Sequence, residues 1–515
     1  MATQLFQKKS IDKLIAGADV PGHRLRKTLG PWSLTALGIG AIIGTGIFIL
    51  TGTAAAGEVL QVPSILKAPL LDAVLHGRQA LGTAGRPGAG PGIALSFLLV
   101  AVACALAGLC YAELASMIPI AGSAYTYAYA TLGEIVAWII GWDLILEYAV
   151  SNMAVAVGFS AYVDSLLQGF GLVLPRKFMQ PLFVSGRYTG AYFNVPGFLI
   201  VMILTVILVI GIRESAGANN FMVTLKLLAI LIFLVASSRY VHLANWRPFM
   251  PNGWQGVLTG GAIVFFTYIG FDSVSTAAEE CKNPRKDVPF GIIASLVVCA
   301  LLYVSVALVL TGIQHWETLR NAAPVANALV AIGLPNVMKW VTVGALAGMI
   351  SSLLVYQLGQ ARVWFAMSRD GLLPRVFSRV HPRFRTPHVS TWVAGFFVAI
   401  PGGVFDIGTL ADLSNIGTLF AFVLVSLGVL MLRWKQPERQ RAFRTPWVPV
   451  VPILSILCCL ILMASLPVET WVRFLVWLVL GLTIYVGYSR HHSEFGRAPQ
   501  ALITTPVEAN PGPEV

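Results

Sequence analysis

Apolar runs long enough to cross a lipid bilayer recur along almost the whole chain. A bilayer core of about 30 Å needs about 20 apolar residues per helix, and about twelve segments reach that length. They lie near residues 32–57, 91–119, 124–155, 196–212, 218–237, 257–278, 288–313, 338–367, 387–405, 407–432, 447–466 and 469–489. Only 11% of the 515 residues are charged, whereas a soluble domain has about 25%. The pattern predicts an all-α integral membrane protein with about 12 transmembrane helices.

The net charge of +12 could suggest a nucleic-acid partner, but the basic residues are not gathered in one domain. With the N-terminus in the cytoplasm, about 23 Lys and Arg residues fall on the inner side and about 11 on the outer side. The inner excess lies in residues 1–31, 362–385 and 433–444. We therefore expect no nucleic-acid partner, a multi-pass protein of the plasma (inner) membrane, and cytoplasmic N- and C-termini.

Other residue types argue against several classes of protein. The six cysteines lie in or beside apolar segments, so no extracellular disulfide framework or metal site is expected. The eight histidines lie in tails, connections or at a segment's end, which argues against a membrane enzyme with a buried histidine site. No repeated channel filter is present. We expect no enzyme activity, no metal and no cofactor.

The first apolar segment contains an uncharged, glycine-rich run at residues 37–52, LGIGAIIGTGIFILTG. Each glycine costs a helix interior about 1 kcal/mol relative to alanine. A helix broken in hydrocarbon leaves N–H and C=O groups unpaired, so a break is tolerated where those groups face a cavity or a ligand. The ends of two half-helices can then hold an amine and a carboxylate. Alternatively, the glycines only let another helix pack closely.

The sixth apolar segment repeats this anomaly. Gly270 interrupts an apolar run, and Asp272 follows at a position suited to capping a new half-helix. Interruptions in the first and sixth of twelve helices suggest two five-helix halves with a binding site near the bilayer midplane. The aromatic residues of this segment either line that site or pack in the core or against lipid: Phe265, Phe266, Tyr268 and Phe271.

Two further segments carry charged residues at membrane depth, where they normally face a cavity or a partner. In the third segment Asp143 and Glu147 share a helix face, and Glu134 is close enough to the helix start to be interfacial. Glu147 is either a functional acid or a protonated, hydrogen-bonded packing residue. Lys226 is the one charge of the fifth segment. It either faces the bundle interior, in place of a coupling cation or as a proton carrier, or snorkels to the surface.

Four stretches of the sequence carry a family resemblance: GAIIGTGIFILTG, AGLCYAELASMIPIAGSAYTYAYATLGE, FFTYIGFDSVSTAAEECKNP and SRDGLLP. The chain resembles an amino-acid permease of the amino acid–polyamine–organocation superfamily, nearest the bacterial relatives of the cationic amino acid transporters. The resemblance covers most of residues 30–490. It implies a LeuT-like five-plus-five inverted repeat with helices 1 and 6 discontinuous. The halves would be residues 32–237, with an outer-loop insertion at 58–90, and 257–432. Helices 11 and 12 (447–489) and a flexible tail (491–515) would follow.

The resemblance also implies how the substrate is bound. Its carboxylate would meet the backbone N–H groups of Thr45 and Gly46. Its α-amino group would meet backbone carbonyls near four residues: Ile42, Phe266, Thr267 and Ile269.

Three more roles follow from the same resemblance. Phe271 resembles the aromatic residue that covers the substrate. Lys226 matches the helix-5 lysine that replaces a sodium site in proton-coupled relatives, and Glu147 matches a helix-3 acid proposed to take part in coupling. Protons are then a second partner; whether a small membrane subunit also binds stays open.

Substrate choice is inferred from Tyr356. It falls where true cationic transporters have a small residue that leaves room for a long side chain, so it should shorten the pocket. We therefore expect a secondary active transporter for small or medium neutral L-amino acids, with proton-coupled uptake by alternating access. Two alternatives remain: a cationic amino acid (Arg/Lys) uniporter or exchanger, and a transporter-like amino acid sensor.

Overall fold

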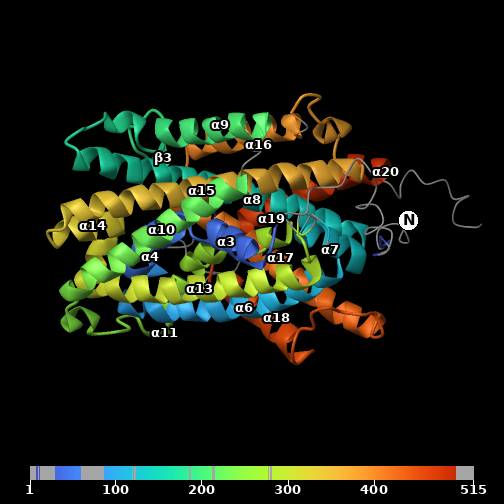
Figure 1. The fold of residues 1–515 in the computed structure, drawn as a ribbon, viewed down its shortest axis with the longest axis horizontal. Coiled ribbons are helices and arrows are strands. Elements are labelled where there is room, and N and C mark those ends of the chain that lie inside the picture. Colours follow the sequence, from blue (N-terminus) through green and yellow to red (C-terminus); the bar gives the residue numbers. More distant parts are fainter. Residues whose placement is uncertain are drawn as a thin grey trace, which may run out of the picture.

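The computed structural model describes residues 7–9, 11, 29–58, 86–118, 120, 123–184, 187–211, 215–276, 278, 281–384 and 386–493. Helices that run side by side form most of this structure (Figure 1). The α-helices are α3 (Pro31–Ile42), α4 (Thr45–Ala56), α6 (Ile93–Met117), α7 (Ser123–Thr131), α8 (Glu134–Gly169), α9 (Val195–Ile210), α10 (Ser215–Ser237), α11 (Gly253–Val264), α12 (Ser273–Thr276), α13 (Pro284–Ile313), α14 (Pro324–Ala331), α15 (Pro335–Arg369), α16 (His388–Gly402), α17 (Ile407–Lys435), α18 (Val450–Ala464), α19 (Val468–Ile484) and α20 (Arg490–His492).

Short 3₁₀ turns, one π-helical turn and two small strand pairs complete the described elements. The 3₁₀ turns are η2 (Gly90–Gly92), η3 (Arg176–Phe178), η4 (Ser238–Tyr240), η5 (Leu243–Trp246), η6 (Phe265–Tyr268), η8 (Trp316–Leu319) and η9 (Arg375–Ser378), and the π turn is η10 (Tyr485–Ser489). The antiparallel pairs are β1 (Gly57–Glu58) with β2 (Arg86–Pro87) and β3 (Phe183–Val184) with β4 (Arg187–Tyr188). Most of the predicted insertion and of both predicted tails lies outside the described residues.

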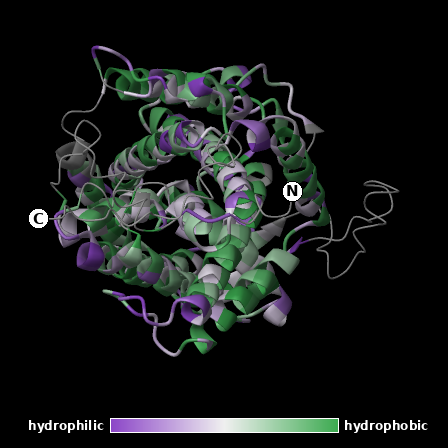
Figure 2. Ribbon diagram, turned by 90° about the vertical axis from the view of Figure 1, so that its right-hand side faces the viewer, coloured by the Kyte–Doolittle hydropathy of each residue, from purple (hydrophilic) through white to green (hydrophobic). Residues whose placement is uncertain are grey.

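Eight helical stretches of the described chain are long and apolar enough to cross a membrane. The pair α3 and α4 adds a span bent by 44°, and α9, α16 and α18 are shorter apolar helices. Large apolar side chains such as Val476 on α19 point outward and are exposed, as suits a surface that meets lipid. Seen along the bundle, hydrophobic helices surround the core, and hydrophilic residues gather in the end loops (Figure 2). The chain is an all-helical, multi-pass membrane protein.

The core is built around α8, which lies against α15 and α17, while α13 lies against α6 and α3. The predicted third segment differs from this structure at its start. Gly133 has φ +108°, a left-handed conformation that favours glycine, and it separates α7 from α8. Glu134 then opens α8, and its side chain is buried within the protein. Its carboxylate accepts hydrogen bonds from the hydroxyls of Tyr129 (3.0 Å) and Tyr485 (2.9 Å).

Helical geometry is interrupted in the first and sixth apolar segments, at their glycines. In the first, Ile43 and Gly44 lie between α3 and α4. In the sixth, α11 tightens into η6, and the chain then leaves helical geometry at Ile269 until α12 begins. Gly270 has φ +115° there, which a residue with a Cβ adopts only with strain.

Candidate functional site

The break between α3 and α4 is filled by donors from two other helices. The Nζ of Lys226, on α10, donates to the carbonyl oxygens of Gly40 (2.7 Å) and Ile43 (2.8 Å). The Oγ of Ser352, on α15, lies 3.1 Å from the Gly40 oxygen and 3.3 Å from that of Ile43. The last four carbonyls of a helix lack intrahelical partners, so these donors stabilise the broken end. Lys226 is fully buried and does not snorkel.

Tyr303, on α13, joins the two interrupted helices. Its hydroxyl lies 3.0 Å from the Ile42 oxygen and 2.9 Å from the Thr267 oxygen. A phenol has one proton to donate, so it bonds fully to one carbonyl at a time. Both carbonyls belong to the predicted amine-binding set. The sequence did not single out Tyr303, because one tyrosine in an apolar run resembles any core aromatic residue.

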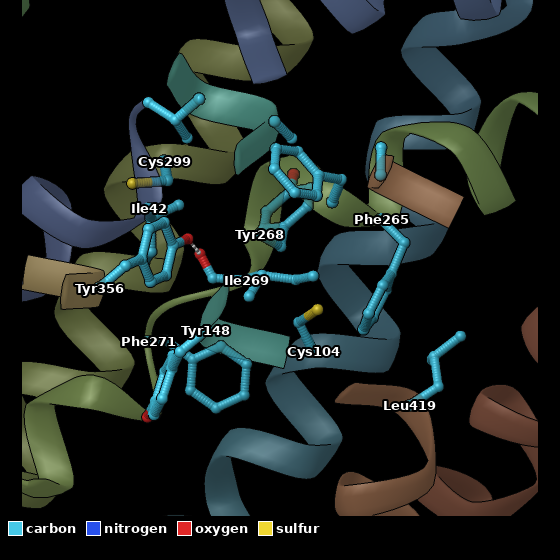
Figure 3. Packing of buried hydrophobic residues seen from close by; sticks show 14 of the residues in the cluster. Ile42, Cys104, Tyr148, Phe265, Tyr268, Ile269, Phe271, Cys299, Tyr356 and Leu419 are labelled. Atoms are coloured by element: carbon cyan, nitrogen blue, oxygen red, sulfur yellow. Dashed lines mark hydrogen bonds between the residues drawn. The ribbon is translucent and has the colours of Figure 1, made fainter. Parts of the chain in front are cut away.

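A second tyrosine meets the interrupted sixth segment (Figure 3). The Tyr356 hydroxyl, on α15, donates to the Ile269 oxygen at 2.8 Å. A Cβ added to Gly270 would lie 3.1 Å from that hydroxyl and 3.0 Å from the Cβ of Ala41. The glycine therefore permits both the left-handed turn and the close approach of α3 and α15.

The two interrupted segments touch where α4 begins. A Cβ added to Gly46 would lie 2.6 Å from the Cγ2 of Thr267, so α4 and η6 approach closely because residue 46 is glycine. The Thr45 hydroxyl donates to the Val155 oxygen of α8 at 3.3 Å. The first N–H groups of α4, those of Thr45 and Gly46, have no helical partner before them. A carboxylate at that helix end would be stabilised.

The predicted aromatic cover is also buried. The Phe271 ring lies against the rings of Tyr111 (5.7 Å between centroids) and Phe422 (4.9 Å). The next residue, Asp272, accepts a hydrogen bond from the Tyr148 hydroxyl of α8 at 2.9 Å. Phe266 is buried in η6. The structure therefore brings all eight predicted substrate-binding residues to the two interruptions or their surroundings.

Glu147 has the carboxyl groups of Asp272 and Asp143 as electrostatic neighbours. Within the described residues, the carboxyl oxygens of Glu147 and Asp143 make no hydrogen bond shorter than 3.5 Å. The Thr418 hydroxyl faces Glu147 but donates to the Ser414 oxygen. Burying a carboxylate without a hydrogen bond is costly, so these two carboxyl groups stay candidates for a functional role.

Comparison with known proteins identifies the family of the chain. A family model described as amino acid permease matches residues 29–487. The chain is 48% identical over 500 residues to the branched-chain amino acid permease BcaP of Bacillus subtilis (strain 168), covering 96% of this chain and 100% of that protein. It is 45% identical over 491 residues to the methylthioribose transporter of the same organism, covering 95% and 99%. The cationic amino acid transporter 9, chloroplastic, of Arabidopsis thaliana is 32% identical, covering 93% of this chain and 91% of that protein.

These matches confirm the predicted family and exclude the alternative that the protein is an enzyme. No group of three or more potential metal ligands occurs in the described part of the chain. The match spans nearly all helices, including both interruptions and the helices that supply Lys226, Tyr303 and Tyr356. The chain belongs to the amino acid permease family of the amino acid–polyamine–organocation superfamily and is a membrane transporter.

Proposed function

We propose that this protein is a secondary active transporter that takes up small or medium neutral L-amino acids together with a proton, by alternating access. The observation that carries the proposal is the meeting of two interrupted helices at the Tyr303 hydroxyl. Backbone groups freed at membrane depth are costly, and a zwitterion offers an ammonium group for the carbonyls and a carboxylate for the N–H groups.

The proposed architecture is a LeuT-like arrangement of twelve spans. The eight long apolar helices, the pair α3 and α4 taken as one span, and the shorter helices α9, α16 and α18 together support that number. The inverted halves would be residues 32–237 and 257–432, with helices 11 and 12 at 447–489. The interrupted spans are then the first of each half, as in inverted-repeat transporters with midplane sites. The positive-inside pattern supports an inner-membrane protein with cytoplasmic termini.

In the proposed substrate complex, the ammonium group replaces side-chain donors at the carbonyls of Ile42, Thr267 and Ile269. The carboxylate then accepts hydrogen bonds from the Thr45 and Gly46 N–H groups at the start of α4. Each group would meet the helix terminus of favourable polarity. Phe266 and Phe271 would border the substrate.

Two observations support a substrate with a neutral side chain. Tyr356 reaches the interruption at Ile269, where its ring takes up space that a long substrate would need. The relative at 48% identity is named as a branched-chain amino acid permease, and the named cationic transporter is more distant at 32%. Because one methylene is worth only about 1–3 kcal/mol of discrimination, we expect several neutral amino acids to be accepted.

Proton coupling is assigned to Lys226 and Glu147. Lys226 donates to two carbonyls of α3 and its linker, so losing a proton there would weaken the contacts that hold the broken end. Its ammonium group can also stand where a coupling cation would bind. Glu147 is buried and has a carboxylate that no described hydrogen bond occupies, as suits a group that takes up and releases a proton.

Uptake into proteoliposomes tests this function. We expect labelled L-leucine to accumulate when the outside is acidified, and unlabelled isoleucine and valine to compete, whereas arginine and lysine do not. Accumulation of arginine without a pH gradient would favour the cationic uniporter or exchanger. Binding without uptake would favour a sensor, and competition by methylthioribose alone would favour the activity named for the relative at 45% identity.

A further inference from the structure

A cavity of about 410 Å³ lies away from the helix interruptions, where α6 ends and α13 begins. Four arginine side chains and the end of α6 line it: Arg285, Arg439, Arg441, Arg444, Ser116 and Met117. Arg285 belongs to the first turn of α13, and the other three arginines belong to the connection between α17 and α18. Two segments far apart in sequence thus contribute arginine residues to the lining of one cavity.

The connection between α17 and α18 is firmly attached to α6 through one buried carboxylate. Glu113 accepts two hydrogen bonds from Arg433, both 2.9 Å, and one from Arg441 at 3.0 Å. It also accepts the backbone N–H of Thr445 at 2.8 Å. Arg441 further donates to the carbonyl oxygens of its own loop, including those of Gln436 and Arg439, both within 2.8 Å. These hydrogen bonds hold the connection between α17 and α18, which forms this wall of the cavity, in place against α6.

The described residues that line this cavity include four arginines and no acidic residue. Glu113 is shared between two guanidinium groups, Arg433 and Arg441. Burial lowers the pKa of the Arg441 guanidinium, Glu113 opposes that shift, and the nearby Arg433 and Arg444 lower the pKa further. Asp287 is engaged with the backbone N–H of Asn283 at the start of α13.

Arg285 and Arg444 are the residues suited to direct binding. Both side chains are exposed, whereas Arg441 uses its donors within the protein. A guanidinium group binds phosphate oxygens with two parallel hydrogen bonds, and the first turn of α13 adds a favourable helix end. We propose that this cavity binds a phosphate ester, namely the headgroup phosphate of an anionic phospholipid.

The surroundings of the cavity favour a lipid over a soluble phosphate. Trp434 and Trp447 flank the arginine-rich connection, and each is 81% exposed. Exposed tryptophans next to membrane helices mark the headgroup level of a bilayer. Basic pockets at helix ends on the cytoplasmic side bind anionic headgroups, and the orientation proposed above from the inner excess of Lys and Arg puts this connection on that side.

Lipid retention by the full-length protein tests the proposal. The purified chain is placed in nanodiscs of phosphatidylcholine with or without phosphatidylglycerol, and lipid carried into the gas phase is counted by native mass spectrometry. We expect R285Q/R444Q to retain phosphatidylglycerol at least fivefold less than the wild type. The matched control R375Q/R379Q removes two exposed arginines elsewhere and should retain the wild-type amount. If the double variant does not fold, each single substitution is measured.

A second arm distinguishes the source of the phosphate. Inorganic phosphate is added to protein in phosphatidylcholine nanodiscs, and the midpoint of thermal unfolding is measured. Stabilisation by phosphate that R285Q/R444Q abolishes, without selective phosphatidylglycerol retention, would support the phosphate site but replace the lipid by a soluble ester. Equal retention by the wild type and R285Q/R444Q, together with no phosphate effect, would overturn the proposal. Neither readout depends on transport.

Discussion

Replacing Tyr303 with phenylalanine should make the transporter bind its substrate more tightly. In the substrate-free structure the Tyr303 hydroxyl occupies the carbonyls of Ile42 and Thr267, which the substrate ammonium must take over. Binding therefore breaks the Tyr303 hydrogen bond only in the wild type, whereas the Tyr356 hydrogen bond to the Ile269 oxygen is given up in both proteins. A buried hydrogen bond contributes about 1 kcal/mol net, which corresponds to about a fivefold change in Kd.

The assay is equilibrium binding of labelled L-leucine to purified Y303F at fixed pH, with the wild type measured in parallel. Tyr162 provides a matched control, because its buried hydroxyl donates at 2.8 Å to the Phe48 oxygen of α4, a carbonyl outside the predicted substrate-binding set. Y162F should bind leucine with a Kd within about twofold of the wild type. Equal or weaker binding by Y303F would refute the idea that Tyr303 and the substrate compete for the same carbonyls.

Four further substitutions test individual roles. K226M should insert normally but lose gradient-driven accumulation of leucine, because a charge-assisted hydrogen bond is worth about 1.5–3 kcal/mol and two are removed; normal accumulation would restrict Lys226 to packing. E147Q should flatten the pH dependence of uptake, and an unchanged pH profile would remove Glu147 from coupling. Y356S should admit longer substrates in competition assays, with about 1–3 kcal/mol per accommodated methylene; an unchanged substrate profile would contradict its specificity role. G46V should abolish leucine binding and cost about 1–3 kcal/mol of stability, measured by thermal unfolding, since a Cβ there lies 2.6 Å from Thr267; wild-type binding would disprove the close approach.

The interruptions could be located from the sequence, because in each of the two apolar segments only the glycines weaken the helix. The burial of Lys226 followed from the cost of a charge in hydrocarbon, although its sequence position also allowed snorkelling. The structure shows Lys226 facing the bundle interior, since its Nζ donates hydrogen bonds to two carbonyls at the interruption between α3 and α4.

Tyr303 could not be found in the same way. It is 36 residues from Thr267 and 261 from Ile42, and only the crossing of α13 with both interrupted segments brings them together. The division of the third segment at Gly133 was also missed, because one glycine beside an apolar run does not reveal its φ angle. Likewise, the arginines of the connection between α17 and α18 indicated topology, whereas their arrangement around Glu113 depends on the fold.

A density map of the protein with bound L-leucine tests the central claim most directly. We predict that the leucine carboxylate lies within hydrogen-bond distance of the Thr45 and Gly46 N–H groups. Its ammonium group should meet the carbonyls of Ile42, Thr267 and Ile269, with the Tyr303 hydroxyl displaced from the first two and the Tyr356 hydroxyl from the third. Leucine density elsewhere, or continuous helices through Ile43–Gly44 and Ile269–Asp272 with lipid between them, would contradict this account.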